Sequence, residues 1–216
     1  MKYELVVFDW DGTLLDSAGA IVQAIQAACR DLEVPVPDDA RARHVIGLGL
    51  IDAMRHAVPG LPSDQYPAVA DRYRHHYLSG DHQLTLFEGV RDMLTRLQRA
   101  GHILTIATGK SRNGLDRALE HSGLGVFFQA TRCADECHSK PHPQMLEELM
   151  AEFGRGPEST IMIGDTSHDL QMAINAGVGS LGVTYGAHPH EHLLEHQPLA
   201  CFHSVKELDQ WLFHYA

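Results

Sequence analysis

Short apolar runs alternate with stretches of helical periodicity along most of this chain. The apolar runs lie at residues 4–8, 103–107, 129–133, 160–163 and 180–183. They are short and rich in β-branched residues, which is typical of strands buried in a sheet. The helical stretches lie at residues 89–100, 111–122, 142–153 and 168–176, and a short strand near Ala200 precedes a last helix from Ser204. This alternation predicts a parallel sheet with right-handed helical crossovers.

No strand signal interrupts residues 16–83. Residues 17–33 place apolar side chains on one face of a helix, with Ser17 as its expected N-cap. Further helical stretches at 38–43, 49–58 and 63–79 are separated by glycine and proline. We therefore expect an α/β protein with a Rossmann-like parallel-sheet core formed by residues 1–15 and 86–216. A small helical cap, residues 16–85, is expected to be inserted after the first strand.

The composition narrows the class of protein. A chain of 216 residues with 44% hydrophobic and 21% charged residues fits one large or two small globular domains. It contains no apolar run of about 18 residues that could span a membrane, and its start lacks the layout of a signal peptide, so we expect a cytoplasmic protein. The net charge of −11 disfavours nucleic-acid binding. An anionic substrate would therefore need local positive charge from a metal or a few lysines and arginines.

Two groups of potential metal-binding residues need separate interpretation. Cys133, Cys137 and His138 form a CxxxCH group without a second paired half, so reduced thiols are favoured over a zinc site. Four histidines gather near the C-terminus: His188, His190, His192 and His196. They could bind a transition metal, but Gly186 and Pro189 favour a solvated loop that leads into a helix.

Polar and acidic side chains directly follow three of the predicted strands. These segments are DWDGT at 9–13, TGK at 108–110 and GDTSHD at 164–169. Ligands of an open parallel sheet bind at the carboxyl ends of its strands, so the segments should converge on one edge. Several carboxylates on one edge repel one another unless a cation lies between them. Because their oxygens are hard ligands, we expect magnesium.

Asp9 and Asp11 lie two residues apart in an extended segment, so their side chains start on the same side. One carboxylate can stay ionised at the metal as a nucleophile while the other holds a proton. Gly12 permits the positive φ that such a turn needs. A calcium loop of the EF-hand type is disfavoured because Asp16 is the next acid and helix-like residues follow.

Two basic residues are further candidates. Lys140-Pro141 opens the helix predicted at 142–153, with proline near its first turn, and the lysine could reach the same edge and neutralise phosphate oxygens. Taken alone, this dipeptide fits a solvated surface lysine better. Arg43 begins a glycine-containing loop at 43–49 and could bind a second anionic group of a substrate. A plain helix connection with a surface arginine is an equal alternative.

Together, these segments resemble the four motifs of the haloacid dehalogenase superfamily of phosphohydrolases. Residues 9–13, 108–109, 140–141 and 164–169 match the motifs in order, spacing and strand-end position, so the resemblance covers nearly the whole chain. The insert after the first motif is similar to the small helical cap of this superfamily. DGTLLDS at 11–17 and IGLGL at 46–50 look most like the phosphoglycolate phosphatase branch.

The resemblance implies a magnesium-dependent phosphatase. Asp9 would attack phosphorus and become an aspartyl phosphate, and Asp11 would protonate the leaving oxygen and then activate the hydrolytic water. Thr108, the amide of Gly109 and Lys140 would hold the phosphoryl group. The implied metal ligands are Asp9, the backbone carbonyl of Asp11, Asp165 and, through water, Asp169.

Several alternatives stay open at this point. A phosphomutase acting on a sugar phosphate would share the core and differ in the cap. A phospho-accepting signalling module has no cap insert, and a non-catalytic binding protein would be expected to lose Asp9, Asp11 or Lys140. Asp11 also argues against the true dehalogenases, which lack this acid. The expected partner is a small phosphorylated metabolite, such as phosphoglycolate, a sugar phosphate or pyrophosphate.

Overall fold

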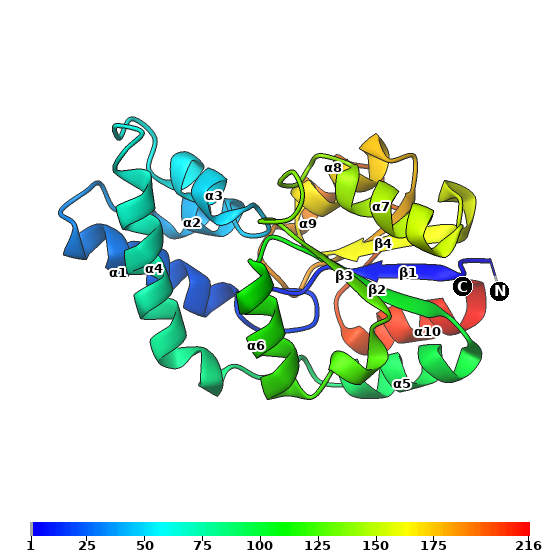
Figure 1. The fold of residues 1–216 in the computed structure, drawn as a ribbon. Coiled ribbons are helices and arrows are strands. Elements are labelled where there is room, and N and C mark those ends of the chain that lie inside the picture. The colour runs from blue at the N-terminus through cyan, green and yellow to red at the C-terminus, as the bar shows by residue number, and fades with distance from the viewer. Residues whose placement is uncertain (1) are drawn as a thin grey trace.

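The computed structural model describes residues 2–216 and shows six parallel strands in one sheet, in the order β3-β2-β1-β4-β5-β6 (Figure 1). The strands are β1 Leu5–Phe8, β2 Ile103–Thr108, β3 Ala130–Cys133, β4 Thr160–Gly164, β5 Gly179–Val183 and β6 Ala200–Phe202. The α/β parallel-sheet core predicted from the sequence is therefore confirmed.

The first strand lies at the centre of the sheet. Leu5 is paired with Ile103 of β2 on one side and with Thr160 of β4 on the other. All four residues of β1 are buried, as expected of a strand covered on both faces. This register brings the carboxyl ends of β1, β2 and β4 together at one edge, although the three segments are far apart in the sequence.

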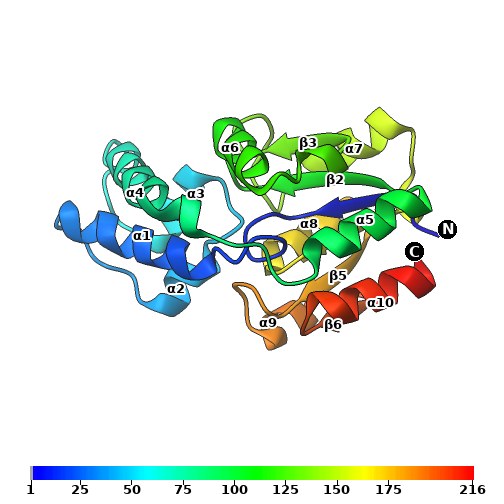
Figure 2. The same cartoon turned by 90° about the horizontal axis from the view of Figure 1, so that it is seen from below.

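Helices cover both faces of the sheet (Figures 1 and 2). One face carries α5 (Val90–Ala100) and α10 (Val205–Tyr215), and the other carries α7 (Gln144–Phe153) and α8 (Ser167–Asn175). Val6 and Phe8 of β1 belong to the first apolar layer, whereas Leu5 and Val7 belong to the second, because alternate side chains of a strand face opposite sides. The remaining helices of this part are α6 (Arg112–Ser122), α9 (His190–Leu194) and the 3₁₀ turns η2 (Gly125–Phe127) and η3 (Pro157–Ser159).

A separate helical block lies beyond the carboxyl ends of the strands (Figures 1 and 2). It contains α1 (Ala18–Asp31), α2 (Asp39–His44), α3 (Leu50–Ala57), α4 (Tyr66–Gly80) and the 3₁₀ turn η1 (Asp81–Gln83). Its apolar side chains, including Ile25, Met54 and Val69, form a cluster of their own. The chain enters and leaves the block side by side, because the Asp16 amide donates to the Thr85 carbonyl at 3.0 Å. We propose that this helical block, within residues 16–85, is a cap domain.

Two local predictions need correction. Ser17 is the N-cap residue of α1, as predicted, but its hydroxyl makes no capping bond and donates instead to Asp11 Oδ1 at 2.7 Å. The helix expected to open at Pro141 begins at Gln144, because its first-turn amides donate to the carbonyl of Pro143. Lys140 therefore lies in a loop that precedes the helix. Over residues 2–216, no helix has both the length and the apolar character that a membrane crossing requires.

Candidate active site

A cleft of about 1380 Å³ separates the strand ends from the helical block. The core side is lined by the segments that follow β1 and β2, including Asp9, Asp11 and Thr108. The helical block contributes residues 45–54 together with Tyr73 and Tyr77 of α4. The cleft thus has acidic groups at its base and mainly apolar side chains opposite them.

Three buried carboxylates form a group, of which Asp9 lines the cleft and the other two lie against Asp9. Asp9 follows β1, Asp165 follows β4 and Asp169 lies in the first turn of α8. One carboxylate oxygen of each residue lies within 4.8 Å of the others. The Asp9 amide donates to the Ile163 carbonyl at 2.9 Å, which continues the β1–β4 ladder and fixes the first two acids side by side.

Lys140 connects two of these acids. Its Nζ atom lies 2.6 Å from Asp9 Oδ1 and 2.6 Å from Asp169 Oδ1. The lysine side chain is fully buried, so it is not the solvated surface residue that the dipeptide alone suggested. Burial lowers the pKa of this ammonium group, but the attraction of Asp169 and Asp9 outweighs burial and raises the pKa of Lys140.

Asp165 is held by neutral donors. Its Oδ1 atom accepts from Thr13 Oγ1 at 3.0 Å, and its Oδ2 atom accepts from the Ala187 amide at 2.7 Å. Gly12 packs directly against this carboxylate: a Cβ atom at position 12 would lie 2.1 Å from Asp165 Oδ2, and the φ angle there is +83°. The glycine of the first motif is therefore required by both space and backbone conformation.

The charges and hydrogen bonds of this group fit a divalent cation. When all three carboxylates are ionised, the one ammonium group leaves two negative charges uncompensated in a buried site. Asp9 Oδ2 is buried and has no hydrogen-bond partner among residues 2–216. Burial, with repulsion from Asp169, raises the pKa of Asp9 to about 7, and burial and repulsion by Asp9 raise the pKa of Asp165 well above its usual value. A hard cation would satisfy the free oxygen and favour the ionised carboxylates.

Asp11 has different partners from the other acids. Its Oδ1 atom accepts from the Ser17 hydroxyl, and its Oδ2 atom lies 3.1 Å from Lys110 Nζ. Lys110 also donates to the Tyr77 hydroxyl at 3.1 Å and lies 4.6 Å from the centre of that ring. The attraction of Asp11 outweighs burial and raises the pKa of Lys110, so the lysine stays charged. Asp11 is therefore linked to α4 of the helical block through Lys110 and Tyr77.

Thr108 and Gly109 lie where the helical block touches the core. The buried Thr108 hydroxyl accepts from the Lys110 amide at 3.2 Å. A Cβ atom at Gly109 would lie 2.4 Å from the Gly47 carbonyl oxygen and 2.6 Å from that of Leu48. Only glycine permits this approach, and it allows the loop after α2 to reach the edge of the active site.

The sequence of residues 6–183 matches the family model described as haloacid dehalogenase-like hydrolase. The chain belongs to this family of hydrolases. It is an enzyme of the superfamily that the four motifs indicated, so that prediction is confirmed. Apart from Arg43, the side chains predicted for the site lie in or directly beneath the cleft of this haloacid dehalogenase-like hydrolase.

Proteins similar to this hydrolase come from several bacteria. It is 36% identical to a probable phosphatase, IndB, of Dickeya dadantii, with 94% of this chain and 91% of the relative covered. It is 31% identical to a phosphoglycolate phosphatase of Aliivibrio fischeri, with 90% of each chain covered. The crystal structure of a predicted phosphatase from Clostridium acetobutylicum has a TM-score of 0.88 at 25% identity and covers 99% of this chain and 100% of that chain.

One predicted residue of the hydrolase lies outside the cleft. Arg43 is half-buried near the end of α2, and it is not among the residues that line the cleft. The loop that follows it, residues 45–49, does line the cleft. The role of Arg43 in substrate binding therefore stays a prediction.

Three residues near Asp11 received no role in the site from the sequence, although Lys110 belongs to the TGK segment predicted at this edge. Lys110 directly follows the second motif, so its position at a strand end was the signal that could have identified it. Tyr77 is one of several aromatic residues in a helix, and Ser17 was interpreted as a helix cap. The interactions of Tyr77 and Ser17 depend on how the helical block is placed against the sheet, which local sequence patterns do not encode.

Proposed function

We propose that this hydrolase is a magnesium-dependent phosphatase that forms an aspartyl phosphate on Asp9. The observation that carries the proposal is the buried Asp9 carboxylate, which has one oxygen fixed by Lys140 and the other without a partner in the part of the chain that the structure describes. The relatives named probable phosphatase and phosphoglycolate phosphatase support a phosphate ester as substrate. The proposed substrate is a small phosphorylated metabolite, with phosphoglycolate as the first candidate.

The proposed reaction has two steps. In the first, a carboxylate oxygen of Asp9 forms a bond to phosphorus while the bond to the leaving oxygen breaks, and Asp11 gives its proton to that oxygen. In the second, Asp11 takes a proton from water, the water oxygen bonds to phosphorus, and the Asp9 carboxylate departs. Lys140 keeps Asp9 oriented through both steps because it also contacts Asp169.

Asp11 must change protonation state between the two steps. Its Oδ2 atom lies 3.1 Å from Lys110 Nζ, and the ionised carboxylate is the form that activates water. To act as the acid, Asp11 must carry a proton, and this weakens its attraction to Lys110. The Ser17 hydroxyl keeps the carboxyl group near the cleft, because it donates to the other oxygen at 2.7 Å.

Magnesium would be held by Asp9, the backbone carbonyl of Asp11, Asp165 and Asp169, and it would neutralise charge on the phosphoryl oxygens. Thr108, the amide of Gly109 and Lys140 are the proposed phosphoryl-binding groups. Lys110 and Arg43 are the proposed contacts for a second anionic group on the substrate. An acidic protein needs such local cations to attract an anionic metabolite.

Initial rates of phosphate release across a panel of substrates test this proposal. The panel contains phosphoglycolate, a sugar phosphate, pyrophosphate and nitrophenyl phosphate, each with Mg²⁺, with a chelator and with Ca²⁺. We expect release with Mg²⁺, none with the chelator and inhibition by Ca²⁺, whose larger and more variable coordination misplaces the nucleophile. Full activity in the metal-free protein would contradict the proposal, and isomerisation of the sugar phosphate without phosphate release would indicate a phosphomutase instead.

A further inference from the structure

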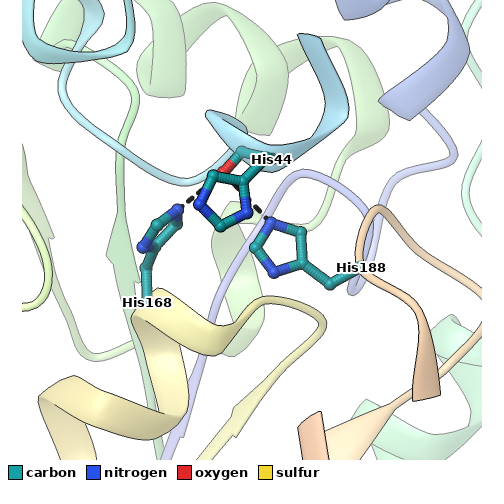
Figure 3. A group of neighbouring side chains, drawn as sticks. All are labelled: His44, His168 and His188. Carbon is teal, nitrogen blue, oxygen red and sulfur yellow. Dashed lines mark hydrogen bonds between the residues drawn. The ribbon is translucent and has the colours of Figure 1, made fainter. Parts of the chain in front are cut away.

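Three histidines meet where the helical block contacts the core. His44 ends α2, His168 lies in the first turn of α8 and His188 lies in the segment between β5 and α9 (Figure 3). The ring centres of His44 and His188 are 5.0 Å apart with the rings stacked, and His168 lies 5.3 and 5.2 Å from them. One ring nitrogen of each residue lies within 4.8 Å of the others. The sequence grouped His188 with its neighbours along the chain, whereas the fold groups it with two distant histidines.

The hydrogen bonds of the group establish where its protons are. The Nε2 atoms of His168 and His188 lie 2.7 Å and 3.1 Å from the backbone carbonyl oxygen of His44 (Figure 3). A carbonyl oxygen only accepts, so both rings carry a proton on Nε2. The Nδ1 atom of His188 accepts from the Ser167 amide at 3.0 Å. His188 is therefore a neutral imidazole.

The surroundings of these rings favour their neutral form. Burial, with repulsion from His168 and His44, lowers the pKa of His188 to about 4. Partial burial, with repulsion from His192 and His56, lowers the pKa of His44. A metal binds the neutral form of imidazole. These rings therefore need not be deprotonated to the neutral form before they bind an ion.

We propose that His44, His168 and His188 form a second metal site, which takes a divalent transition metal such as Zn²⁺. Imidazole nitrogen suits Zn²⁺ and Ni²⁺, whereas Mg²⁺ prefers the oxygen ligands of the acidic site. One ring nitrogen of each histidine lies within 4.8 Å of the others, and bonds of 2.0–2.1 Å at tetrahedral or right angles put ligand nitrogens about 3 Å apart, so rotation of the rings away from the His44 carbonyl would bring the three nitrogens onto one ion. The inference does not depend on the proposed phosphatase reaction.

Metal binding moves protons within the group. The ion takes the places of the Nε2 protons of His168 and His188, and each ring keeps one proton, now on Nδ1. His188 then loses the bond that its Nδ1 atom accepts from the Ser167 amide, so this amide opposes metal binding. The His44 carbonyl loses two donors and lies beside the ion.

A metal bound to this group would connect the helical block to the core. His44 belongs to the helical block, and His168 and His188 belong to the core. An ion bound to all three would hold the block against the core beside the cleft. His168 is the neighbour of Asp169 in the sequence, yet the Asp169 carboxylate is held by Lys140 and Thr166, which keeps the acidic and histidine groups chemically separate.

Zn²⁺ titration against a chromogenic chelator tests the site. Saturating Mg²⁺ is present, and the protein carries Asp165→Asn, which removes one carboxylate of the acidic site. We expect one equivalent of Zn²⁺ to bind, at least tenfold more weakly after His44→Ala or His168→Ala and unchanged after His214→Ala. His214 is an exposed histidine of α10 and serves as the matched control. Unchanged Zn²⁺ binding after His44→Ala would overturn the proposal, as would the absence of binding to the parent protein.

Two further measurements separate ligand loss from misfolding. Circular dichroism and thermal unfolding without metal verify that each variant is folded, which we expect for the exposed His44. Zn²⁺ should raise the Tm of the parent protein and leave the Tm of His44→Ala unchanged. Co²⁺ in place of Zn²⁺ should give visible absorption bands typical of nitrogen ligands, and these bands should be lost in both histidine variants. Because none of these measurements uses turnover, their failure would leave the phosphatase proposal untouched.

Discussion

Replacing Lys140 with methionine removes the buried ammonium group between Asp9 and Asp169 and keeps an unbranched side chain. Both carboxylates lie 2.6 Å from Lys140 Nζ and are shielded from water. Removing one partner of a buried ion pair costs roughly 3–5 kcal/mol of stability, because the remaining charge is left without compensation. We expect a loss of this size for metal-free Lys140→Met at pH 8.

The loss should depend on pH in a defined direction. The pKa of Asp9 is raised to about 7 while Lys140 is present, and removing the lysine raises it further. A raised carboxyl pKa makes folding more favourable below that pKa, because the native state then binds a proton more tightly than the unfolded state. When the pH falls from 8 to 6, the free energy of unfolding of the variant therefore gains more from proton binding than that of the wild type. The difference in the free energy of unfolding between wild type and variant should shrink by roughly 1 kcal/mol, because each unit of pKa difference corresponds to about 1.4 kcal/mol.

Urea unfolding of the metal-free proteins at pH 8 and pH 6 measures both effects. Lys206→Met is the matched control, because Lys206 is exposed on α10 and its loss should change stability by no more than about 0.5 kcal/mol. Phosphate release by Lys140→Met should also be lost with every substrate. A stability loss below about 1 kcal/mol at pH 8, or an equal loss at both pH values, would refute the interpretation of Lys140 as the buried partner of Asp9.

Three further outcomes are expected. Mg²⁺ should raise the Tm more at pH 8 than at pH 5.5. Burial and carboxylate repulsion raise the pKa of Asp9 to about 7, and below this pH protons compete with the metal for the carboxylate. Equal Tm shifts at the two pH values would argue against a metal site at Asp9. Asp11→Asn should slow hydrolysis of alkyl phosphates far more than of nitrophenyl phosphate, whose leaving group needs no proton, and equal losses would exclude Asp11 as the acid. Arg43→Ala should lower kcat/KM about thirtyfold, or roughly 2 kcal/mol, only for substrates with a second anionic group, with the exposed Arg41→Ala as control. No loss with any substrate would leave Arg43 as a surface residue.

The sheet was predictable because its strands are local and strongly patterned. The run ending at Phe8 is apolar throughout, and the structure buries all four residues of β1 on both faces. The rule that ligands bind at the carboxyl ends of parallel strands then brought Asp9, Thr108 and Asp165 to one edge. The helix predicted at 111–122 is α6, which ends at Gly123 with a φ angle of 64°. These features depend on neighbouring residues or on a general rule of sheet topology.

The contacts between the two parts of the chain were not predictable in the same way. Ser17 has the residue type and position of a helix cap, but its hydroxyl donates to Asp11 because the turn after β1 brings that carboxylate nearby. Lys110 meets Tyr77, 33 residues away, only when α4 lies over the strand ends. His188 lies among other histidines in the sequence, and its ring partners come from α2 and α8. Such pairs depend on long-range packing that residue type and periodicity do not specify.

The most direct test of the account is to trap the covalent intermediate. The enzyme is mixed rapidly with a ³²P-labelled substrate from the panel in Mg²⁺, quenched in acid, and reduced with borohydride, which converts an aspartyl phosphate to homoserine that mass spectrometry can locate. The account predicts labelled protein and reduction at Asp9 in the wild type and in Asp16→Asn, where an exposed carboxylate is changed. It predicts no label in folded Asp9→Asn, with turnover lower by several orders of magnitude. Label on another residue, or near-normal turnover by Asp9→Asn, would contradict it.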